Sequence, residues 1–111
     1  MRLPNAEQAI IAPQKLRDYL LSPSHQRGRH KARVFHALGF RAESWFVFET
    51  ALREQHLTQD AEELAGGRFG RRYRITAAIT GPNGGTAIIR SAWIILHGEE
   101  IPRFVSAYPA E

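Results

Sequence analysis

The chain has 111 residues, a formal net charge of +4 at pH 7 and no cysteine. A chain of this length forms one domain, and the lack of cysteine excludes disulfide bonds and thiolate chemistry, so a metal site would need histidines and carboxylates alone. The N-terminal segment MRLPNAEQAI lacks the apolar stretch of a secretory signal or of a membrane-spanning helix. We therefore expect a soluble, cytoplasmic protein that does not contact a membrane.

Two helices are predicted to pack against the rest of the chain. Residues 9–11 form a short edge strand or an extended lead-in, and Pro13 then favours the first turn of a helix that runs to Leu20. A later helix is predicted from about residue 42 to residue 56. Its apolar face carries Trp45, Phe48 and Leu52.

Between them, a helix over residues 25–38 changes from basic to apolar along one face. Its apolar stripe consists of Val34, Phe35 and Leu38. The same face continues toward the N-terminus with Lys31, His30 and Arg27. Ser24 can cap the start of this helix, but Gly28 weakens its first turn, so the start lies anywhere between Ser24 and Gly28. Gly39 is placed to end the helix. Such a helix can pack under a sheet at one end and open into a cleft at the other. The alternative is an ordinary amphipathic helix whose first turn frays into solvent.

From Arg68 onward the hydrophobic period changes to two, which indicates β-strands. The segment GPNGG at 81–85 predicts a hairpin turn, because proline sets one φ angle and the glycines accept positive ones. The returning strand over 86–96 is apolar on both faces, which is typical of a central strand. A last strand is predicted over 101–108.

These elements predict the α+β class, with N-terminal helices packed on an antiparallel meander sheet of three to four strands. We expect a single domain over residues 1–111. Its helical part extends over about 13–57 and its sheet part over about 68–108.

Positive charge is concentrated in two segments without acidic residues. No aspartate or glutamate occurs between Asp18 and Glu43 or between Glu63 and Glu99. The two segments contain ten cations: Arg27, Arg29, Lys31, Arg33, Arg41, Arg68, Arg71, Arg72, Arg74 and Arg90. If the fold brings these segments together, the surface suits a polyanion, of which nucleic acid is the commonest case. A GC-rich genome would explain the number of arginines but not the acid-free segments.

The chemistry-bearing residues favour RNA cleavage without a metal or another cofactor. There is no glycine-rich phosphate loop, HExxH motif or GxSxG motif. A histidine, a lysine and several arginines beside a sheet with hydroxyls remain, and these suffice. A base removes the 2′-OH proton, cations stabilise the phosphorane, and an acid protonates the leaving 5′ oxygen. Histidine suits the proton transfers because it titrates near neutral pH.

Four segments carry a resemblance that covers nearly the whole chain: LPNAEQAIIAPQKLRDYLLSPSH, GRHKARVFHALGF, YRITAAITGPNGGTAIIRSAWII and IPRFVSAYP. They resemble an uncharacterised bacterial domain family. The order of helices and strands is also similar to that of the barnase, EndoU, colicin and RelE group of toxin ribonucleases. Within that group, His30-Lys31 followed by Ser91-Ala92-Trp93 resembles the arrangement in colicin D.

The resemblance to colicin D implies that His30 is the general acid or base beside Lys31, and that Ser91 donates a hydrogen bond to the phosphate. RelE-type members, which work largely with arginine and lysine, imply that Arg72 and Arg74 make the main phosphate contacts. The expected catalytic residues are therefore His30, Lys31, Ser91 and Arg72. The expected RNA-binding residues are Arg27, Arg29, Arg71, Arg74 and Trp93. In the alternative interpretation, Ser91 and Trp93 only pack within the core.

We predict a metal-independent RNA-cleaving toxin domain that leaves a 2′,3′-cyclic phosphate and belongs to a toxin–antitoxin or polymorphic toxin system. Its expected partners are RNA and a cognate antitoxin or immunity protein. The alternative is a non-catalytic basic module that binds nucleic acid or protein, such as an antitoxin-like partner.

Overall fold

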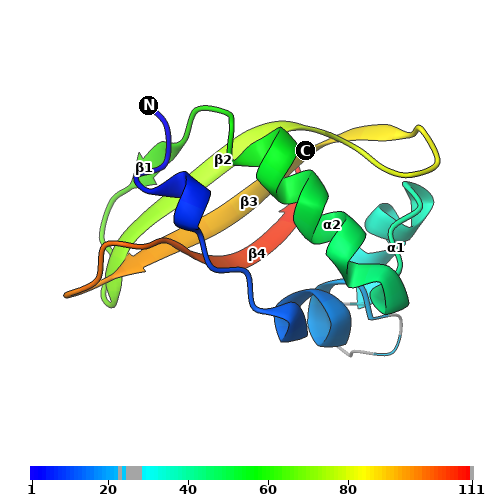
Figure 1. Cartoon of the computed structure of the whole chain (residues 1–111), viewed down its shortest axis with the longest axis horizontal. Coiled ribbons are helices and arrows are strands. Elements are labelled where there is room, and N and C mark those ends of the chain that lie inside the picture. Colours follow the sequence, from blue (N-terminus) through cyan, green and yellow to red (C-terminus); the bar gives the residue numbers. More distant parts are fainter. Residues whose placement is uncertain (23, 25–28, 111) are drawn as a thin grey trace.

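The computed structural model describes residues 1–22, 24 and 29–110, and for residues 29–31 it describes the backbone alone. The helical elements are η1 (Ala6–Gln8), η2 (Lys15–Leu20), α1 (Arg29–Ala37), η3 (Ala42–Ser44), α2 (Trp45–Ala51) and η4 (Leu52–His56). The strands are β1 (Glu62–Leu64), β2 (Gly70–Thr80), β3 (Thr86–Leu96) and β4 (Arg103–Pro109). The predicted α+β class is confirmed (Figure 1). Within the described residues, no helix has the length and apolar character needed to cross a bilayer.

The sheet is an antiparallel meander in which each strand pairs with the next, in the order β1-β2-β3-β4. The hairpin between β2 and β3 forms at the predicted turn, where the Gly81 N–H donates to the Gly85 carbonyl at 2.9 Å. Gly84 takes a φ of 87° there, which a side chain would disfavour. The central position of β3 is confirmed, since it pairs with both β2 and β4.

Strand β1 lies outside the predicted sheet part, which began at about residue 68. Glu62 pairs with Arg74, and Leu64 pairs with Arg72. A three-residue strand with two glutamates has no hydrophobic alternation, so the sequence contains no signal for it. Its pairing with β2 alone defines it.

Residues 9–11 form the extended lead-in rather than an edge strand. Ile10 makes an isolated parallel bridge with Arg103. Its N–H donates to the Pro102 carbonyl at 2.9 Å, and its carbonyl accepts from the Phe104 N–H at 2.8 Å. The lead-in therefore lies beside the start of β4.

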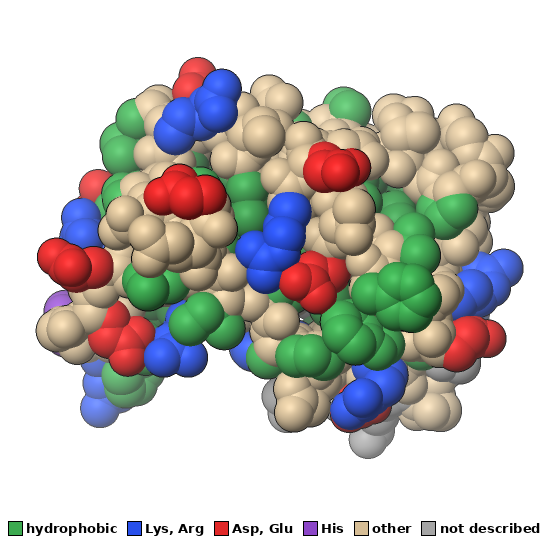
Figure 2. Space-filling view, in the orientation of Figure 1, with side chains coloured by type: hydrophobic (Ala, Val, Ile, Leu, Met, Phe, Trp, Pro, Cys, Tyr) green, Lys and Arg blue, Asp and Glu red, His purple; other side chains and the backbone are tan. Residues whose placement is uncertain are grey.

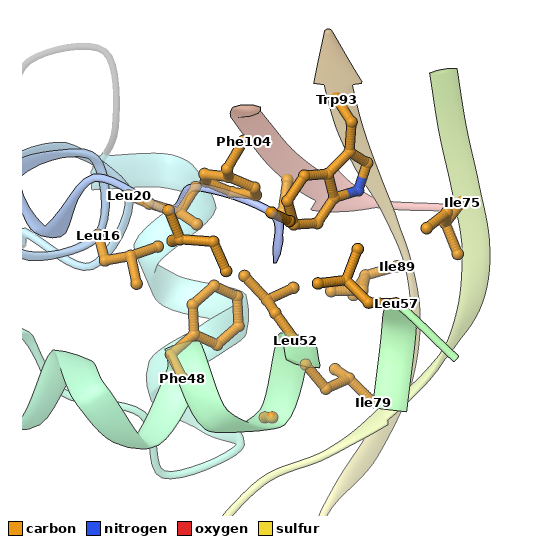
Figure 3. Packing of buried hydrophobic residues seen from close by; sticks show 14 of the residues in the cluster. Leu16, Leu20, Phe48, Leu52, Leu57, Ile75, Ile79, Ile89, Trp93 and Phe104 are labelled. Atoms are coloured by element: carbon orange, nitrogen blue, oxygen red, sulfur yellow. The ribbon is translucent and has the colours of Figure 1, made fainter. Parts of the chain in front are cut away.

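The core lies between the sheet and the helical segment formed by η3, α2 and η4, which crosses one face of the sheet (Figure 1). Phe48 is fully buried, with ring centroids 4.9 Å from Phe35 and 4.8 Å from Phe40. Figure 3 shows Phe48 and Leu52 in one layer with Ile89 from the sheet. The predicted apolar face of this segment is thus confirmed for Phe48 and Leu52, while Trp45 is only half-buried.

Helix α1 buries the predicted stripe in part, and it ends at Ala37, one residue before the predicted end. Phe35 and Leu38 are buried, whereas Val34 is half-buried. Gly39 ends the helix as predicted, because it takes a φ of 96° and donates to the His36 carbonyl at 2.9 Å. The Phe40 N–H donates to the Phe35 carbonyl at 3.0 Å, which completes a Schellman motif.

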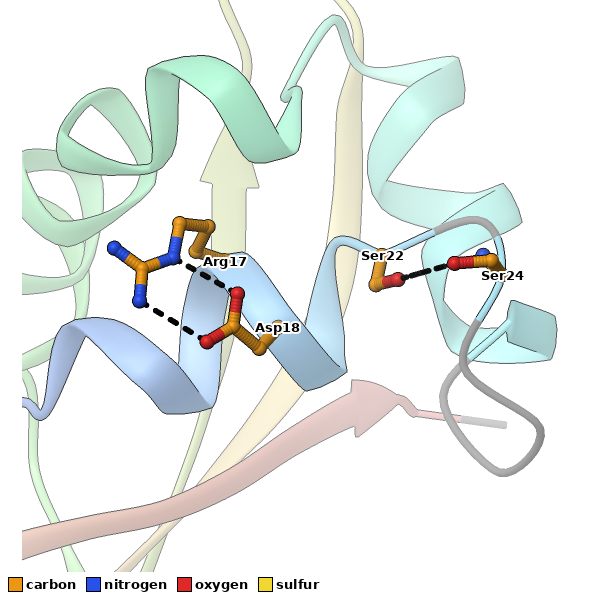
Figure 4. A network of polar contacts seen from close by, with 4 residues as sticks. All are labelled: Arg17, Asp18, Ser22 and Ser24. Atoms are coloured by element: carbon orange, nitrogen blue, oxygen red, sulfur yellow. Dashed lines mark hydrogen bonds and ion pairs between the residues drawn. The ribbon is translucent and has the colours of Figure 1, made fainter.

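The predicted cap at Ser24 stays a prediction, because residues 25–28, between Ser24 and Arg29 of α1, lie outside the described residues. The Ser24 N–H donates to Ser22 Oγ at 3.4 Å, and the two hydroxyls lie 3.2 Å apart (Figure 4). Nearby on η2, Arg17 pairs with Asp18, and their hydrogen bond raises the pKa of Arg17 and lowers that of Asp18. Both side chains are exposed, so screening by water leaves this pair little effect on stability.

Candidate functional site

The sheet has one face covered by α2 and η4 and a second face, here called the open face. Side chains alternate between these faces along each strand. The open face carries the outward-facing residues Arg72, Arg74, Thr76, Ala78, Ile88, Arg90, Ala92, Ile94, Arg103, Ser106 and Tyr108. Each of these is at least partly exposed, whereas Tyr73, Ile75, Ile89 and Trp93 on the covered face are buried. The open face is therefore accessible to a ligand.

Arg74 occupies the middle of β2 on the open face, between an acidic and a phenolic partner. Its Nη2 lies 2.8 Å from Glu62 Oε1 on β1. The hydrogen bond to Glu62, and then that to Tyr108 on β4, raise the pKa of Arg74. The guanidinium is thus held against the sheet surface.

Two further arginines on the open face have local partners. Arg72 Nη2 donates to the Ala65 carbonyl at 2.6 Å. A carbonyl carries no formal charge, so this hydrogen bond does not neutralise the guanidinium. Arg103 Nε lies 3.0 Å from Glu99 Oε1. With Arg74 and Arg90, the open face has four arginines, and among the described residues only Glu62 and Glu99 pair with any of them. The surface keeps a positive surplus suited to phosphate groups.

Ser91 and Trp93 lie on the covered face of β3 and not on the open face. Ser91 is 0% exposed and Trp93 is 1% exposed. Trp93 packs edge-on against Phe104, with ring centroids 5.2 Å apart. These positions agree with the core interpretation, because neither side chain can contact RNA in this structure. The contact to phosphate expected for Ser91 and the RNA contact expected for Trp93 are not available.

The Ser91 hydroxyl instead joins a buried network with His56, which the sequence analysis did not single out. His56 is 0% exposed, and its Nε2 lies 3.1 Å from the Ala77 carbonyl. A carbonyl only accepts, so Nε2 carries the proton and Nδ1 accepts the Ser91 hydroxyl proton at 2.8 Å. The Trp93 Nε1–H donates to Ser91 Oγ at 2.9 Å. Each polar group of the network therefore has a partner when the imidazole of His56 is neutral.

A helical signal for His56 exists in the sequence. His56 follows Leu52 by four residues and Phe48 by eight, so it continues the apolar face of that helix. Its cross-chain partner could not be predicted, because Ser91 lies 35 residues away in the sequence.

This network makes stability depend on pH. Burial lowers the pKa of His56, despite the opposing effect of its bond to Ala77. Between that folded pKa and the ordinary value near 6.5, the unfolded chain binds more protons than the folded one. The free energy of unfolding should therefore fall as pH drops below about 6.5, by up to about 1.4 kcal/mol for each pH unit.

Urea unfolding of the wild type and of His56→Gln between pH 7.5 and 5.5 measures this effect. The variant has no titrating group at this position, so its stability should change less over this range. The exposed His97 provides the matched control, and His97→Ala should keep the wild-type pH dependence. Equal slopes for the wild type and His56→Gln would contradict the assignment.

The residues of the two predicted basic segments do not all lie on the open face. Arg27 lies outside the described residues, as do the side chains of Arg29, His30 and Lys31. The backbone of α1, which carries the last three, contacts β4. Arg71 is exposed at the start of β2, but on the covered side of the strand, where it donates to Tyr73 Oη at 3.2 Å. Of the predicted site residues whose side chains the structure describes, Arg72 and Arg74 alone lie on the open face, where Arg90 of the same basic segment also lies.

The helical face of the molecule is different in character. Figure 2 shows positive and negative side chains interspersed over it. A hollow of about 340 Å³ lies between the N-terminal segment and η4, and one of about 320 Å³ lies between α2 and the β2–β3 turn. Neither is lined by a predicted site residue that the structure describes. Among all the residues that the structure describes, no three histidine or acidic side chains are grouped so that they could hold a metal ion.

Comparison with known proteins gives one match. No curated protein and no solved structure matches the chain. A family model, described as a domain of unknown function (DUF6883), matches residues 2–111. The prediction of an uncharacterised domain family is confirmed, and the chain belongs to the DUF6883 family.

Proposed function

We propose that this chain is a ribonuclease toxin domain that binds RNA on its open face and cleaves it without a metal, leaving a 2′,3′-cyclic phosphate. The observation that carries the proposal is the set of arginines on the open face, whose described residues are all at least partly exposed. Arg72 and Arg74 are neighbours there on one strand, and Arg90 and Arg103 lie on the next two.

An uncovered sheet face of this kind suits a single RNA strand. Arginine makes paired, charge-assisted hydrogen bonds to phosphate oxygens. The partly exposed aliphatic residues and Tyr108 between the arginines offer apolar surface to bases. Phosphate contacts of this type place the strand, and the RNA's own 2′-OH provides the nucleophile.

The proton transfers are assigned to His30. The three histidines whose side chains the structure describes are each engaged in contacts within the fold. His36 Nε2 donates to the Leu21 carbonyl at 2.8 Å, His56 is buried in its network, and His97 Nε2 lies 3.1 Å from the Arg68 carbonyl. Because Ser91 is buried, the arginines of the open face and Lys31 stabilise the phosphorane in this proposal.

A ribonuclease acting in the cytoplasm of the cell that makes it needs a neutralising partner. We therefore keep an antitoxin or immunity protein as the second partner besides RNA. An acidic surface on that protein would compete with RNA for the open face.

The second candidate function is a non-catalytic RNA-binding module. The composition of the described open face favours it, because that face has arginines and hydroxyls but no imidazole. Such a module needs the positive surface alone.

Cleavage of RNA in excess chelator distinguishes the two. The ribonuclease should shorten mixed cellular RNA in EDTA and leave ends with cyclic phosphate, detected by their resistance to phosphatase until acid opens the ring. The double variant Arg72→Gln/Arg74→Gln should need more RNA to reach half-maximal rate. Binding without cleavage would favour the non-catalytic module, and cleavage only with added metal would contradict the mechanism.

A further inference from the structure

Arg90 lies at the centre of the open face. It occupies the central strand β3, where it pairs with Thr76 on β2 and with Tyr108 on β4. Arg74 is its diagonal neighbour, since it pairs with Ala92, two residues farther along β3. Diagonal positions on a sheet are about 7–8 Å apart, which long side chains bridge. Arg90, Arg74 and Tyr108 therefore surround one point on the surface.

Arg90 differs from the other arginines of the open face in the hydrogen bonding of its guanidinium group. Its Nε is buried and has no hydrogen-bond partner. Arg74 and Arg103 have carboxylates within 3.0 Å, and Arg72 has a carbonyl. Among the described residues, no acidic side chain forms an ion pair with Arg90.

An unpaired, buried guanidinium N–H is unusual, because it loses its hydrogen bond to water without gaining another. A structural arginine would have a carboxylate or carbonyl beside it. The nearest described open-face groups are a threonine, a tyrosine and a second arginine, all of which can donate to an anion. The site is thus complementary to a tetrahedral oxyanion, and the carboxylate described beside it, Glu62, pairs with Arg74.

We infer that Arg90 is the central phosphate-binding residue of the open face and holds one phosphodiester group of the RNA strand, with Arg74 and Tyr108 beside it. This inference rests on the proposed function and names the residue on which binding depends most. The phosphate supplies acceptors for the guanidinium of Arg90, a partly exposed residue whose buried Nε has no partner among the described residues. Binding therefore stabilises the fold as well as the complex.

The test uses a single-stranded RNA oligonucleotide with 2′-O-methyl groups, which cannot be cleaved through its own hydroxyl. Its affinity is measured by fluorescence anisotropy for the wild type, Arg90→Met, Arg90→Lys and Arg17→Gln. Arg90→Met should bind roughly 10- to 100-fold more weakly, as for the loss of a charge-assisted hydrogen bond. Its salt dependence should fall by about 0.7 in log–log slope. Arg90→Lys keeps the charge without the paired donors, so its affinity for the oligonucleotide should lie between those of the wild type and Arg90→Met.

Arg17→Gln is the matched control, since it removes an exposed arginine of η2 that has a carboxylate partner and is not part of the open face. It should bind within about threefold of the wild type. The melting temperature of Arg90→Met without RNA should equal or exceed that of the wild type, because methionine keeps an unbranched apolar stem and removes the unpaired N–H. A melting temperature several degrees lower would assign Arg90 to the structure and overturn the inference.

The outcomes separate this inference from the proposed function. If the wild type binds the oligonucleotide and Arg90→Met binds equally well, the Arg90 site is wrong and RNA binding stands. If the wild type binds no RNA at all, the proposed function fails, and the phosphodiester assignment fails with it. Inorganic phosphate is the remaining arm. If it raises the melting temperature of the wild type but not of Arg90→Met in the absence of any RNA binding, the site takes a small anion instead.

Discussion

Replacing His30 with alanine should slow RNA cleavage by roughly 10²- to 10⁴-fold, while the affinity for RNA changes little. The reason is that alanine removes the proposed acid or base but leaves the cations of the open face in place. Single-turnover cleavage of a labelled RNA in EDTA, together with anisotropy of the uncleavable oligonucleotide, measures the two quantities separately.

His97→Ala is the matched control for this change, since His97 is an exposed histidine in the β3–β4 turn. It should cleave at the wild-type rate. If His30→Ala cleaves as fast as the wild type, the residue assignment is wrong, and an arginine-driven site of the RelE kind, built on Arg72 and Arg74, becomes the better explanation. If both histidine variants lose activity equally, neither loss can be attributed to proton transfer by His30.

Replacing Phe48 with alanine should lower the free energy of unfolding by about 3–5 kcal/mol. Phe48 is 0% exposed, and its ring contacts two other aromatic rings, Phe35 on α1 and Phe40 after it. The substitution leaves a cavity where α1 and α2 meet, so α1 should also become more open to hydrogen exchange. Urea unfolding followed by circular dichroism measures the loss of stability.

The same helix contains the control for this prediction. Phe46 lies two residues earlier on α2 and is 55% exposed, so Phe46→Ala should change the stability by no more than about 0.5 kcal/mol. Comparable losses for the two variants would show that exposure does not separate the two faces of α2 in solution. A loss well under 2 kcal/mol for Phe48→Ala would contradict the packing described for it.

The two faces of β3 explain why Ser91 and Trp93 were expected at the site and why Arg90 was not singled out. Sequence alternation separates Arg90 from Ser91 and Trp93, because neighbouring residues of a strand point to opposite faces. Both sides of β3 are rich in isoleucine, so its pattern does not reveal which side the helices cover. The dipeptide similarity to colicin D placed Ser91 at the site. The packing of η4 places it in the core beside His56.

Local chemistry was sufficient for most elements of the fold. The β2–β3 hairpin follows from the backbone preferences of the proline and glycines at 81–85, and the helix over 42–56 follows from the spacing of Phe48 and Leu52. Gly39 ends α1 for the same local reason, since it alone there accepts a positive φ. These features depend on neighbours within a few residues, which the sequence displays directly.

Tertiary structure alone decided which charges and hydroxyls meet. The pairing of β1 with β2 brings Glu62 to Arg74, and the pairing of β3 with β4 brings Tyr108 to Arg90. Nothing in the local sequence around Arg90 distinguishes it from the other arginines. Its buried, unpaired Nε results from the two strands that flank it, and the free energy of such a contact depends on residues that only the folded sheet brings together.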